Sequence, residues 1–339
     1  MAITIRDVAK QAGVSIKTVS RVINNETVVS EDTRSRVVTV MQELGYTPNI
    51  SAQRLARGRS YVLGLVFHNA TWNYIDDVLR GMMETSRAEG YGSLIHPCDI
   101  DRPEDQAEIM RLVTQQRVDG FIFTPPCDNA SILLQKLQTL QIPFVRLTPR
   151  DRRLPLPFVA ANDWQGAYDM TEYLLSLGHR RIGFIRGNPT HQASHDRLAG
   201  YKAALEAHQV SFDPMLVKPG DFHFNSGVSS GRELFEIRPR PTAIFASNDN
   251  MAAGVLAAAH QLGVAVPAEL SVAGFDDVRL AQQVWPSLTT VRQPIHDIAK
   301  WATCFLIGLL KNEALDNLHY ELPTTLVIRE STGQPPPLS

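Results

Sequence analysis

The sequence contains few cysteines. Its three, Cys98, Cys127 and Cys304, are too few and too widely spaced for a disulfide framework or a metal-binding knuckle. We therefore expect all three to be reduced thiols in the protein core.

Long hydrophobic runs are also absent. The longest apolar segments, such as residues 302–310, fall well short of the roughly 18–20 residues needed to cross a bilayer. The first ten residues, MAITIRDVAK, include an acid and no apolar stretch typical of a secretory signal. These two absences predict a cytoplasmic protein.

Motifs of catalysis are missing as well. The sequence has no GxGxxG, P-loop or GxSxG motif and no paired catalytic carboxylates. His191 and His195 have the i, i+4 spacing of zinc ligands, but the HExxH glutamate is absent and a loop is expected there, which favours a structural or effector-loop role. We therefore expect no enzymatic activity, no metal site and no cofactor.

Size and charge suggest more than one domain. The chain has 339 residues, 44% of them hydrophobic and 20% charged, which is typical of a globular protein with two or three domains. Residues 1–60 carry nine Lys/Arg and five Asp/Glu, a net charge of +4, whereas the remainder carries 24 and 30, a net charge of -6. A basic amino-terminal unit on an acidic body indicates an anionic partner for the first unit only.

Three short helices are predicted in the basic unit. The first is capped by Thr4 and ends at Gly13, the second opens at Ser15, and the third opens at Ser30 and ends at Gly45. Their apolar residues recur at helical spacing and predict one small core: Ile5, Val8, Ala9, Ala12, Val19, Val22, Ile23, Val37, Val38, Met41 and Leu44.

The second helix leaves a polar face uncovered. Ile16, Lys17, Ser20 and Arg21 remain on its surface once the apolar side is buried. A helix, a tight turn and a basic second helix suit the major groove of DNA, whereas the alternative is an ordinary packing unit with a solvated basic face.

From residue 61 onward the sequence alternates between strand-like and helical segments. One series runs through YVLGLVF, YGSLIH, VDGFIF and IPFVRL, and a second begins at FVAAN and continues through RIGFIRG, TAIFAS and LSVAGF. Such alternation predicts an α/β body with two parallel-sheet lobes, with ligands at the carboxyl ends of the strands. A helix near 294–312 and the late strand YELPTTLVIR are expected to return the chain to both lobes.

Two segments resemble a known family. TIRDVAKQAGVSIKTVSRVINN and VSEDTRSRVVTVMQELGYTPNISAQRLA look like the DNA-binding headpiece and hinge of the lac repressor family, and the resemblance extends over almost the whole chain. It implies a helix-turn-helix headpiece in residues 1–46, a hinge helix and linker in 47–60, and a body in 61–339. That body resembles a periplasmic-binding-protein-like fold, with an amino lobe in about 61–160 and 292–322 and a carboxyl lobe in about 161–291 and 323–339.

The resemblance also implies DNA contacts. Base edges would be read by Ile16, Lys17 and Arg21, since Lys and Arg donate to guanine and Ile contacts a thymine methyl. Leu55, in a segment too short to form a stable isolated helix, would wedge into the minor groove. Positions that usually bind or orient phosphates are Thr4, Ser15, Thr18, Asn24, Ser30, Tyr46 and Asn49. For Thr4 and Ser30, helix capping is an equally good interpretation.

In the body, the resemblance points to a small effector, expected to be a sugar or glycoside. The implied effector-binding residues are Asn69, Asn73, Tyr74, Asp163, Arg197, Phe222, Asn248 and Asp276. The alternatives are capping for Asn162 and Asp163, a salt bridge within one lobe for Arg197, and core packing for Phe222. Arg197→Ala is expected to spare operator affinity and abolish the effector response.

The first loop, HNATWNYI, and the pair Thr148 and Pro149 depart from common family patterns and leave the effector's identity open. Trp72 and Trp285 are extra aromatics that could widen stacking toward an oligosaccharide or aryl glycoside, and the alternative for both is ordinary surface or interface packing. The resemblance implies a ligand-controlled repressor that binds a pseudo-palindromic operator as a homodimer in the bacterial nucleoid. No heptad repeat follows Arg329, so the tetramerising zipper is not expected. Alternatives are a solute-binding transport protein on the same body and a nucleobase-responsive repressor.

Overall fold

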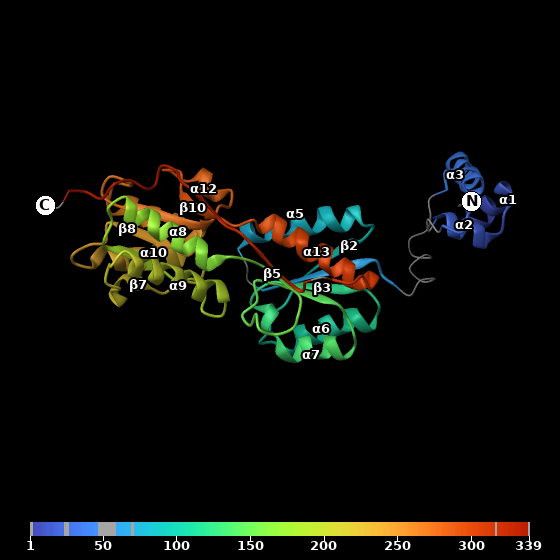
Figure 1. The fold of residues 1–339 in the computed structure, drawn as a ribbon, viewed down its shortest axis with the longest axis horizontal. Coiled ribbons are helices and arrows are strands. Elements are labelled where there is room, and N and C mark those ends of the chain that lie inside the picture. The colour runs from blue at the N-terminus through green and yellow to red at the C-terminus, as the bar shows by residue number, and fades with distance from the viewer. Residues whose placement is uncertain (1–2, 24–26, 47–58, 69–70, 316, 338–339) are drawn as a thin grey trace. The chain divides into compact units, whose positions relative to one another are not determined.

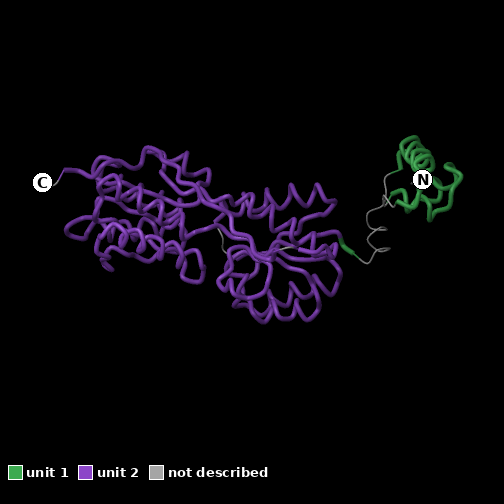
Figure 2. Tube along the Cα trace, viewed as in Figure 1, with its two compact units in different colours: residues 1–60 green, residues 61–339 purple. Residues whose placement is uncertain are grey.

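The computed structural model describes residues 3–23, 27–46, 59–68, 71–315 and 317–337. The chain divides into two compact units, residues 1–60 and 61–339 (Figure 2). Each unit has its own hydrophobic core. None of the described helices is long and apolar enough to cross a membrane.

The described residues of the first unit form three helices, as the apolar spacing predicted: α1 (Ile5–Ala12), α2 (Ile16–Ile23) and α3 (Glu31–Leu44). Gly13 and Gly45 end α1 and α3 in the left-handed conformation, with φ of 66° and 61°, which favours glycine. The buried core consists of Val8, Ala9, Ala12, Val19, Val22, Val37 and Val40.

One predicted core position in α3 is wrong. Val38 is 41% exposed, and Val40 is buried instead. Val37, Val40, Met41 and Leu44 follow the i, i+3, i+4, i+7 spacing of one helix face, whereas Val38 lies about 100° around the helix from Val37.

The second unit contains two six-stranded sheets, which define its two lobes (Figure 1). The amino-lobe sheet is entirely parallel, with strand order β11-β5-β4-β3-β1-β2. Its strands are β1 (Val62–Phe67), β2 (Gly92–Pro97), β3 (Gly120–Phe123), β4 (Phe144–Leu147), β5 (Phe158–Ala161) and β11 (His319–Leu322).

The carboxyl-lobe sheet has the order β12-β10-β9-β8-β6-β7 and is parallel except for the antiparallel edge strand β12. Its strands are β6 (Ile182–Ile185), β7 (Val217–Lys218), β8 (Ala243–Ala246), β9 (Ser271–Asp276), β10 (Thr289–Arg292) and β12 (Thr325–Val327). The central strands are buried on both faces, which explains their continuous apolar runs.

Helices cover both faces of each sheet. The amino lobe has α5 (Trp72–Ala88), α6 (Pro103–Thr114), the 3₁₀ turn η1 (Cys127–Asn129), α7 (Ser131–Thr139) and α13 (Ile295–Lys311). The carboxyl lobe has α8 (Asp163–Ser176), α9 (Gln192–Ala207), η2 (Pro214–Leu216), α10 (Phe224–Glu236), α11 (Asp249–Gln261) and α12 (Leu280–Gln283).

Two sequence-based assignments are confirmed and one is corrected. The helix near 294–312 is α13, which packs against α5 and the amino-lobe strands. The late strand splits into β11 and β12, one in each sheet, so the chain does return to both lobes. The segment FVAAN, however, forms β5 of the first sheet, because its backbone pairs with β4 and β11.

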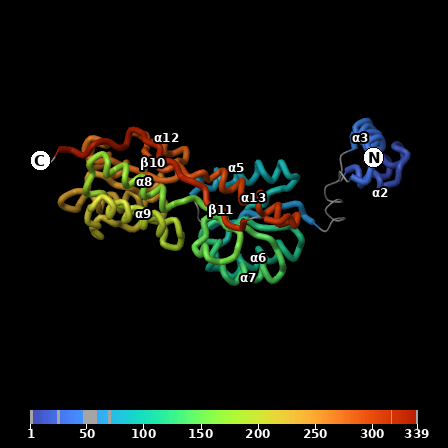
Figure 3. Tube along the Cα trace, viewed as in Figure 1, coloured from blue at the N-terminus to red at the C-terminus, as the bar shows by residue number. Residues whose placement is uncertain are grey.

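The chain passes between the lobes at residues 161–163, 292–295 and 322–325. Figure 3 shows the late segments, in orange and red, running along both lobes. Three short connections of this kind are typical of two-lobed ligand-binding proteins that close by a hinge movement.

The cysteine prediction is correct for two of the three residues. Cys98 and Cys127 are buried free thiols, and the Cys127 thiol lies 3.3 Å from the Cys98 carbonyl oxygen, to which it donates a hydrogen bond. Cys304 is exposed on α13, because its position falls on the outer side of that helix.

A buried histidine ties the late chain to the carboxyl lobe. The His179 Nε2 atom lies 2.9 Å from the Gly333 carbonyl oxygen and 3.0 Å from the Ser271 hydroxyl, and Nδ1 lies 2.8 Å from the Thr242 hydroxyl. Burial lowers the pKa of His179, so the folded protein holds the neutral ring.

We expect His179 to make the body less stable in acid. Since its pKa is lower in the folded than in the unfolded chain, its contribution is present above about pH 6.5 and is lost as the pH falls. Urea unfolding from about pH 7.5 to about pH 5.5 should show a steeper loss of unfolding free energy for the wild type than for His179→Gln. Parallel pH curves for the two proteins would contradict this role.

Candidate functional site

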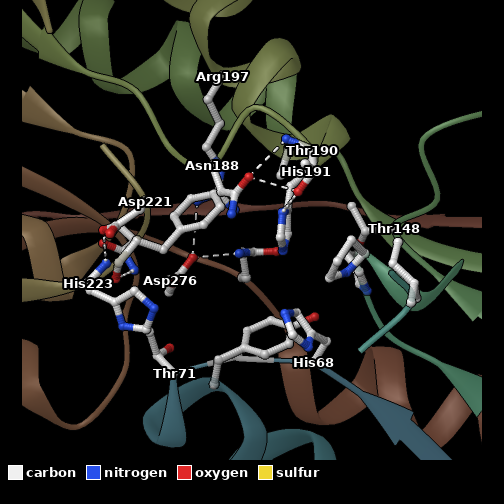
Figure 4. Close-up of a pocket in the computed structure, with 18 of the residues that line it drawn as sticks. His68, Thr71, Thr148, Asn188, Thr190, His191, Arg197, Asp221, His223 and Asp276 are labelled. Atoms are coloured by element: carbon white, nitrogen blue, oxygen red, sulfur yellow. Dashed lines mark hydrogen bonds and ion pairs between the residues drawn. The ribbon is translucent and has the colours of Figure 1, made fainter. Parts of the chain in front are cut away.

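A cavity of about 480 Å³ opens between the two lobes of the second unit (Figure 4). Its volume falls within the range of small-molecule sites. It is lined by His68, Thr71, Tyr74, Asp99, Ile100, Asp101, Pro125, Pro126, Thr148, Asn188, Thr190, His191, Ala193, Arg197, Asp221, Phe222, His223, Asn248, Asp276 and Gln293.

Most of these residues lie in the loops that follow strands. In the amino lobe, His68 follows β1, Asp99 follows β2 and Thr148 follows β4, whereas in the carboxyl lobe Asn188 follows β6 and Asn248 follows β8. The carboxyl ends of both parallel sheets therefore face the cavity, as expected for open α/β sheets.

Arg197 is the most connected polar side chain at the cavity. Its Nε and Nη2 atoms lie 2.8 and 2.7 Å from Asp163 Oδ1, and Nη1 lies 3.4 Å from Asp276 Oδ1 and also donates to the Ser247 carbonyl oxygen. The Arg197 side chain is only 4% exposed, and its guanidinium carbon lies 3.7 Å from the centre of the Phe275 ring.

The structure thus places Arg197 within helix α9 and gives it the ion pairs within the lobe that the sequence left as an alternative. Burial disfavours the charged guanidinium, but the carboxylates of Asp163 and Asp276 outweigh it and raise the pKa of Arg197. Burial raises the pKa of Asp276 to about 6, against the opposing effect of Arg197.

Asn162 and Asp163 adopt the capping positions that were their alternative. The Asn162 side chain accepts from the Gln165 backbone and caps α8, and Asp163 is the first residue of that helix. Asp163 lies behind the cavity rather than on its lining, where its carboxylate binds Arg197.

Phe222 and Asn248 form one unit. The Asn248 amide donates to the Phe222 carbonyl oxygen at 2.9 Å, while its oxygen accepts from the Met251 backbone at 2.9 Å and caps α11. Phe222 has a φ of 73°, and any side chain at Gly187 would overlap its ring. Phe222 both packs against the carboxyl-lobe core and lines the cavity, so its two interpretations coexist.

We expect Asn248→Ala to destabilise the carboxyl lobe by about 1–2 kcal/mol, because it removes a helix cap and the donor to Phe222. Asn248→Asp is the matched comparison, since it keeps an acceptor for Met251 but turns an oxygen toward the Phe222 carbonyl. Urea unfolding of the three proteins measures both contributions. Wild-type stability in Asn248→Asp would show that the bond to Phe222 contributes nothing.

The first amino-lobe loop is only partly described. Asn69 lies outside the described residues. Tyr74 lines the cavity, and burial raises the pKa of its phenol, which stays protonated. Asn73 lies off the lining and donates to the Asn250 side chain at 3.2 Å, so it links the lobes in this arrangement.

The first unit presents the expected basic helix face. On α2, Ile16 is 46% exposed, Lys17 is exposed and Arg21 is half-buried. Asn24, Asn49 and Leu55 lie outside the described residues.

The remaining predicted phosphate-binding residues of this unit have local partners. The Thr4 hydroxyl donates to Asp7 and the Ser30 hydroxyl to Thr33, at the starts of α1 and α3. The Ser15 and Thr18 hydroxyls lie 2.9 Å apart at the start of α2. Tyr46 packs against the three-helix core, and burial raises the pKa of its phenol.

Two family models match these two units. Residues 4–49 match the model described as bacterial regulatory proteins, lacI family, and residues 171–332 match a periplasmic binding protein-like domain. The transcriptional regulator DegA of Bacillus subtilis is 35% identical over 337 residues, covering 98% of this chain and 99% of DegA. The chain belongs to the lacI family.

Other relatives agree with this assignment. The ribose operon repressor of Halalkalibacterium halodurans is 35% identical and covers 97% of each protein. The repressor CytR of Escherichia coli is 32% identical, covering 98% of this chain and 96% of CytR. A lac repressor dimer bound to operator and the anti-inducer ONPF superimposes with a TM-score of 0.81 at 28% identity, covering 98% of this chain and all of that one.

Several cavity residues of this lacI-family regulator were not predicted from its sequence. They include Asp99, Asp101, Asn188, Asp221 and His223. Their shared signal is position, since each follows a strand end. Because β7 and α10 were not recognised, only Phe222 was identified in the loop between them, through the family resemblance. His191, for which a structural or effector-loop role was preferred to zinc binding, lines the cavity, and His195 lies within α9 rather than in a loop.

Two further ideas about the lacI-family body gain no support from the geometry. Trp72 and Trp285 are 77% and 86% exposed, and neither lines the cavity. Within the described ranges, no group of three or more His, Cys, Asp or Glu side chains could hold a metal ion.

Proposed function

We propose that this lacI-family transcriptional regulator binds a pseudo-palindromic operator as a homodimer and changes its operator affinity when a small polyhydroxylated effector occupies the cavity between the lobes. Residues 1–46 would form the DNA-binding headpiece, residues 47–60 the hinge, and residues 61–339 the effector-binding body. The regulator would act in the cytoplasm, at the bacterial nucleoid.

The observation that carries this proposal is the combination of two units in one chain. A three-helix unit with a basic second helix precedes a two-lobed body whose cavity draws residues from both lobes. A ligand that contacts both lobes stabilises one lobe arrangement over another, which is the condition for an allosteric response. The matched headpiece disfavours a transport protein, since residues 4–49 fit the regulatory family.

The cavity supports a sugar or glycoside as the effector. Asp276 offers an acceptor, Arg197 and Asn188 offer polar edges, and Phe222 provides an apolar surface for the C–H face of a sugar ring. A related solved structure, the transcriptional regulator CelR in complex with cellobiose, superimposes with a TM-score of 0.74 at 29% identity and covers 97% of this chain. We propose that Tyr74, Arg197, Phe222 and Asp276 contact the effector.

The test is selection of bound duplexes from a randomised DNA pool, followed by operator-binding assays with a panel of sugars and nucleosides. We expect a two-fold symmetric consensus and at least one sugar that shifts operator affinity. Recovery of DNA without a consensus would contradict sequence-specific binding. Release by a nucleoside and by no sugar would favour the nucleobase-responsive alternative.

A further inference from the structure

The cavity carries an excess of negative charge. Four aspartates line it, namely Asp99, Asp101, Asp221 and Asp276, whereas Arg197 is the single Lys or Arg among its described lining residues. His191 adds no positive charge near neutral pH, because burial lowers its pKa to about 4. The carboxylates come from both lobes, so any ligand between the lobes meets them.

Arg197 is not available to bind an anion. Its guanidinium lies between Asp163 and Asp276, with nitrogen–oxygen distances of 2.7 Å and 3.4 Å, and it also donates to the Ser247 carbonyl oxygen. A phosphate or carboxylate on the ligand that displaced one of these carboxylates would leave it buried without a partner. Such a displacement is strongly unfavourable.

Two helix amino termini at this end of the carboxyl lobe are also occupied. Helices α8 and α11 begin with Asp163 and Asp249, both buried, and the side chains of Asn162 and Asn248 accept from their first-turn N–H groups. A helix amino terminus attracts anions through its free N–H groups and dipole. For α8 and α11, carboxylates and amide oxygens already satisfy that attraction. Helices α5, α9 and α10, whose N-cap residues Thr71, His191 and His223 line the cavity, have no side-chain cap, so at those termini the lining aspartates oppose an anion.

Asp276, in contrast, can accept a further hydrogen bond from a neutral ligand. It is 93% buried and lines the cavity, and its Oδ1 accepts from Gln293 at 2.6 Å and pairs with Arg197. No described side chain or backbone group is hydrogen-bonded to its Oδ2, and that atom is not among the fully buried unpartnered ones. This oxygen therefore faces the cavity as an acceptor, which a sugar hydroxyl can satisfy and an anionic oxygen cannot.

We infer that the cavity selects an uncharged polyhydroxylated effector and rejects its phosphorylated or carboxylated form, with Asp99, Asp101 and Asp221 as the residues that set this selectivity. The inference rests on the proposed function, because it concerns the effector of the same site. The regulator would then respond to a sugar before phosphoryl transfer to it, not after.

The first experiment compares matched ligands. Glucose, ribose and cellobiose are each tested beside their terminal phosphates, together with glucuronate, by calorimetry and by operator release. We expect each phosphate to bind at least about tenfold more weakly than its parent sugar, since three charges at about 7 Å in water each change binding roughly two- to threefold.

The second experiment removes the negative charge of Asp99, Asp101 and Asp221, which we call the rim aspartates. The rim variant carries Asp99→Asn, Asp101→Asn and Asp221→Asn. Asparagine keeps a side-chain oxygen, so positions 99 and 221 can still accept the backbone N–H hydrogen bonds that Asp99 and Asp221 accept in the wild type. We expect the preference for the neutral sugar over its phosphate to fall about tenfold. A control with the same charge change on exposed helix positions, Asp76→Asn, Glu172→Gln and Glu206→Gln, should keep the wild-type preference.

The outcomes separate the two ideas. If a sugar phosphate or glucuronate releases the operator as well as or better than its neutral parent, the selectivity inference is overturned while the proposed function stands. An unchanged preference in the rim variant would overturn the assignment of Asp99, Asp101 and Asp221. If no member of either class binds, the proposed sugar-responsive function fails, and the selectivity inference fails with it.

Discussion

Arg197→Ala is expected to lower the free energy of unfolding of the body by about 3–5 kcal/mol. The substitution leaves Asp163 and Asp276 close together, buried and without the cation that now balances them. Removal of one partner of a buried ion pair is far more costly than the pair's net contribution to stability, because the remaining charge loses its compensation. Urea unfolding followed by circular dichroism measures the loss.

Two comparisons make this prediction specific. Arg153→Ala removes an arginine whose side chain is 92% exposed and pairs with Asp151, and it should leave the unfolding midpoint unchanged. The double variant Arg197→Met with Asp163→Asn should be more stable than Arg197→Met alone, because one of the two uncompensated carboxylates is then neutral. A loss below about 1 kcal/mol in Arg197→Ala would contradict the ion-pair network.

This result changes how a missing effector response is interpreted. The sequence alone led to the expectation that Arg197→Ala spares operator affinity and abolishes the response. With Arg197 at the centre of a buried network, an absent response would follow equally from a loosened lobe. Phe222→Ala is the better probe of ligand contact, since Phe222 lines the cavity and carries no buried charge.

Simultaneous replacement of Lys17 and Arg21 by alanine is expected to weaken specific operator binding by about 2–6 kcal/mol, roughly 30-fold to 10⁴-fold. Both lie on the exposed or half-exposed face of α2, away from Val19 and Val22 in the core. If they read base edges, binding to random DNA should fall much less than binding to the operator. Titrations with operator and random duplexes at one fixed salt concentration measure the ratio.

The control for this prediction is Lys10→Ala. Lys10 is an exposed cation in the last turn of α1, so its removal changes the charge of the unit without changing α2. We expect a small loss that is similar for both duplexes. Equal losses on operator and random DNA in the Lys17 and Arg21 double variant would make these residues phosphate contacts instead.

The sequence by itself determined the local elements. In α1, Ile5, Val8, Ala9 and Ala12 recur at helical spacing, and that spacing alone places them on one buried face. The alternation of apolar runs with helices likewise predicted two parallel-sheet lobes with ligand chemistry at the carboxyl ends of their strands. These features follow from neighbours in the chain, so they can be recognised without knowing the fold.

The partners of individual residues were decided only by the tertiary structure. The late strand YELPTTLVIR divides between two sheets because β11 pairs with β5 and β12 with β10, and neither pairing leaves a local signal. Arg197 meets Asp163 and Asp276 across 34 and 79 positions of sequence. The cavity and its charge depend on loops that follow strands far apart in the chain, and their meeting is fixed by strand order and lobe packing, not by spacing along the sequence.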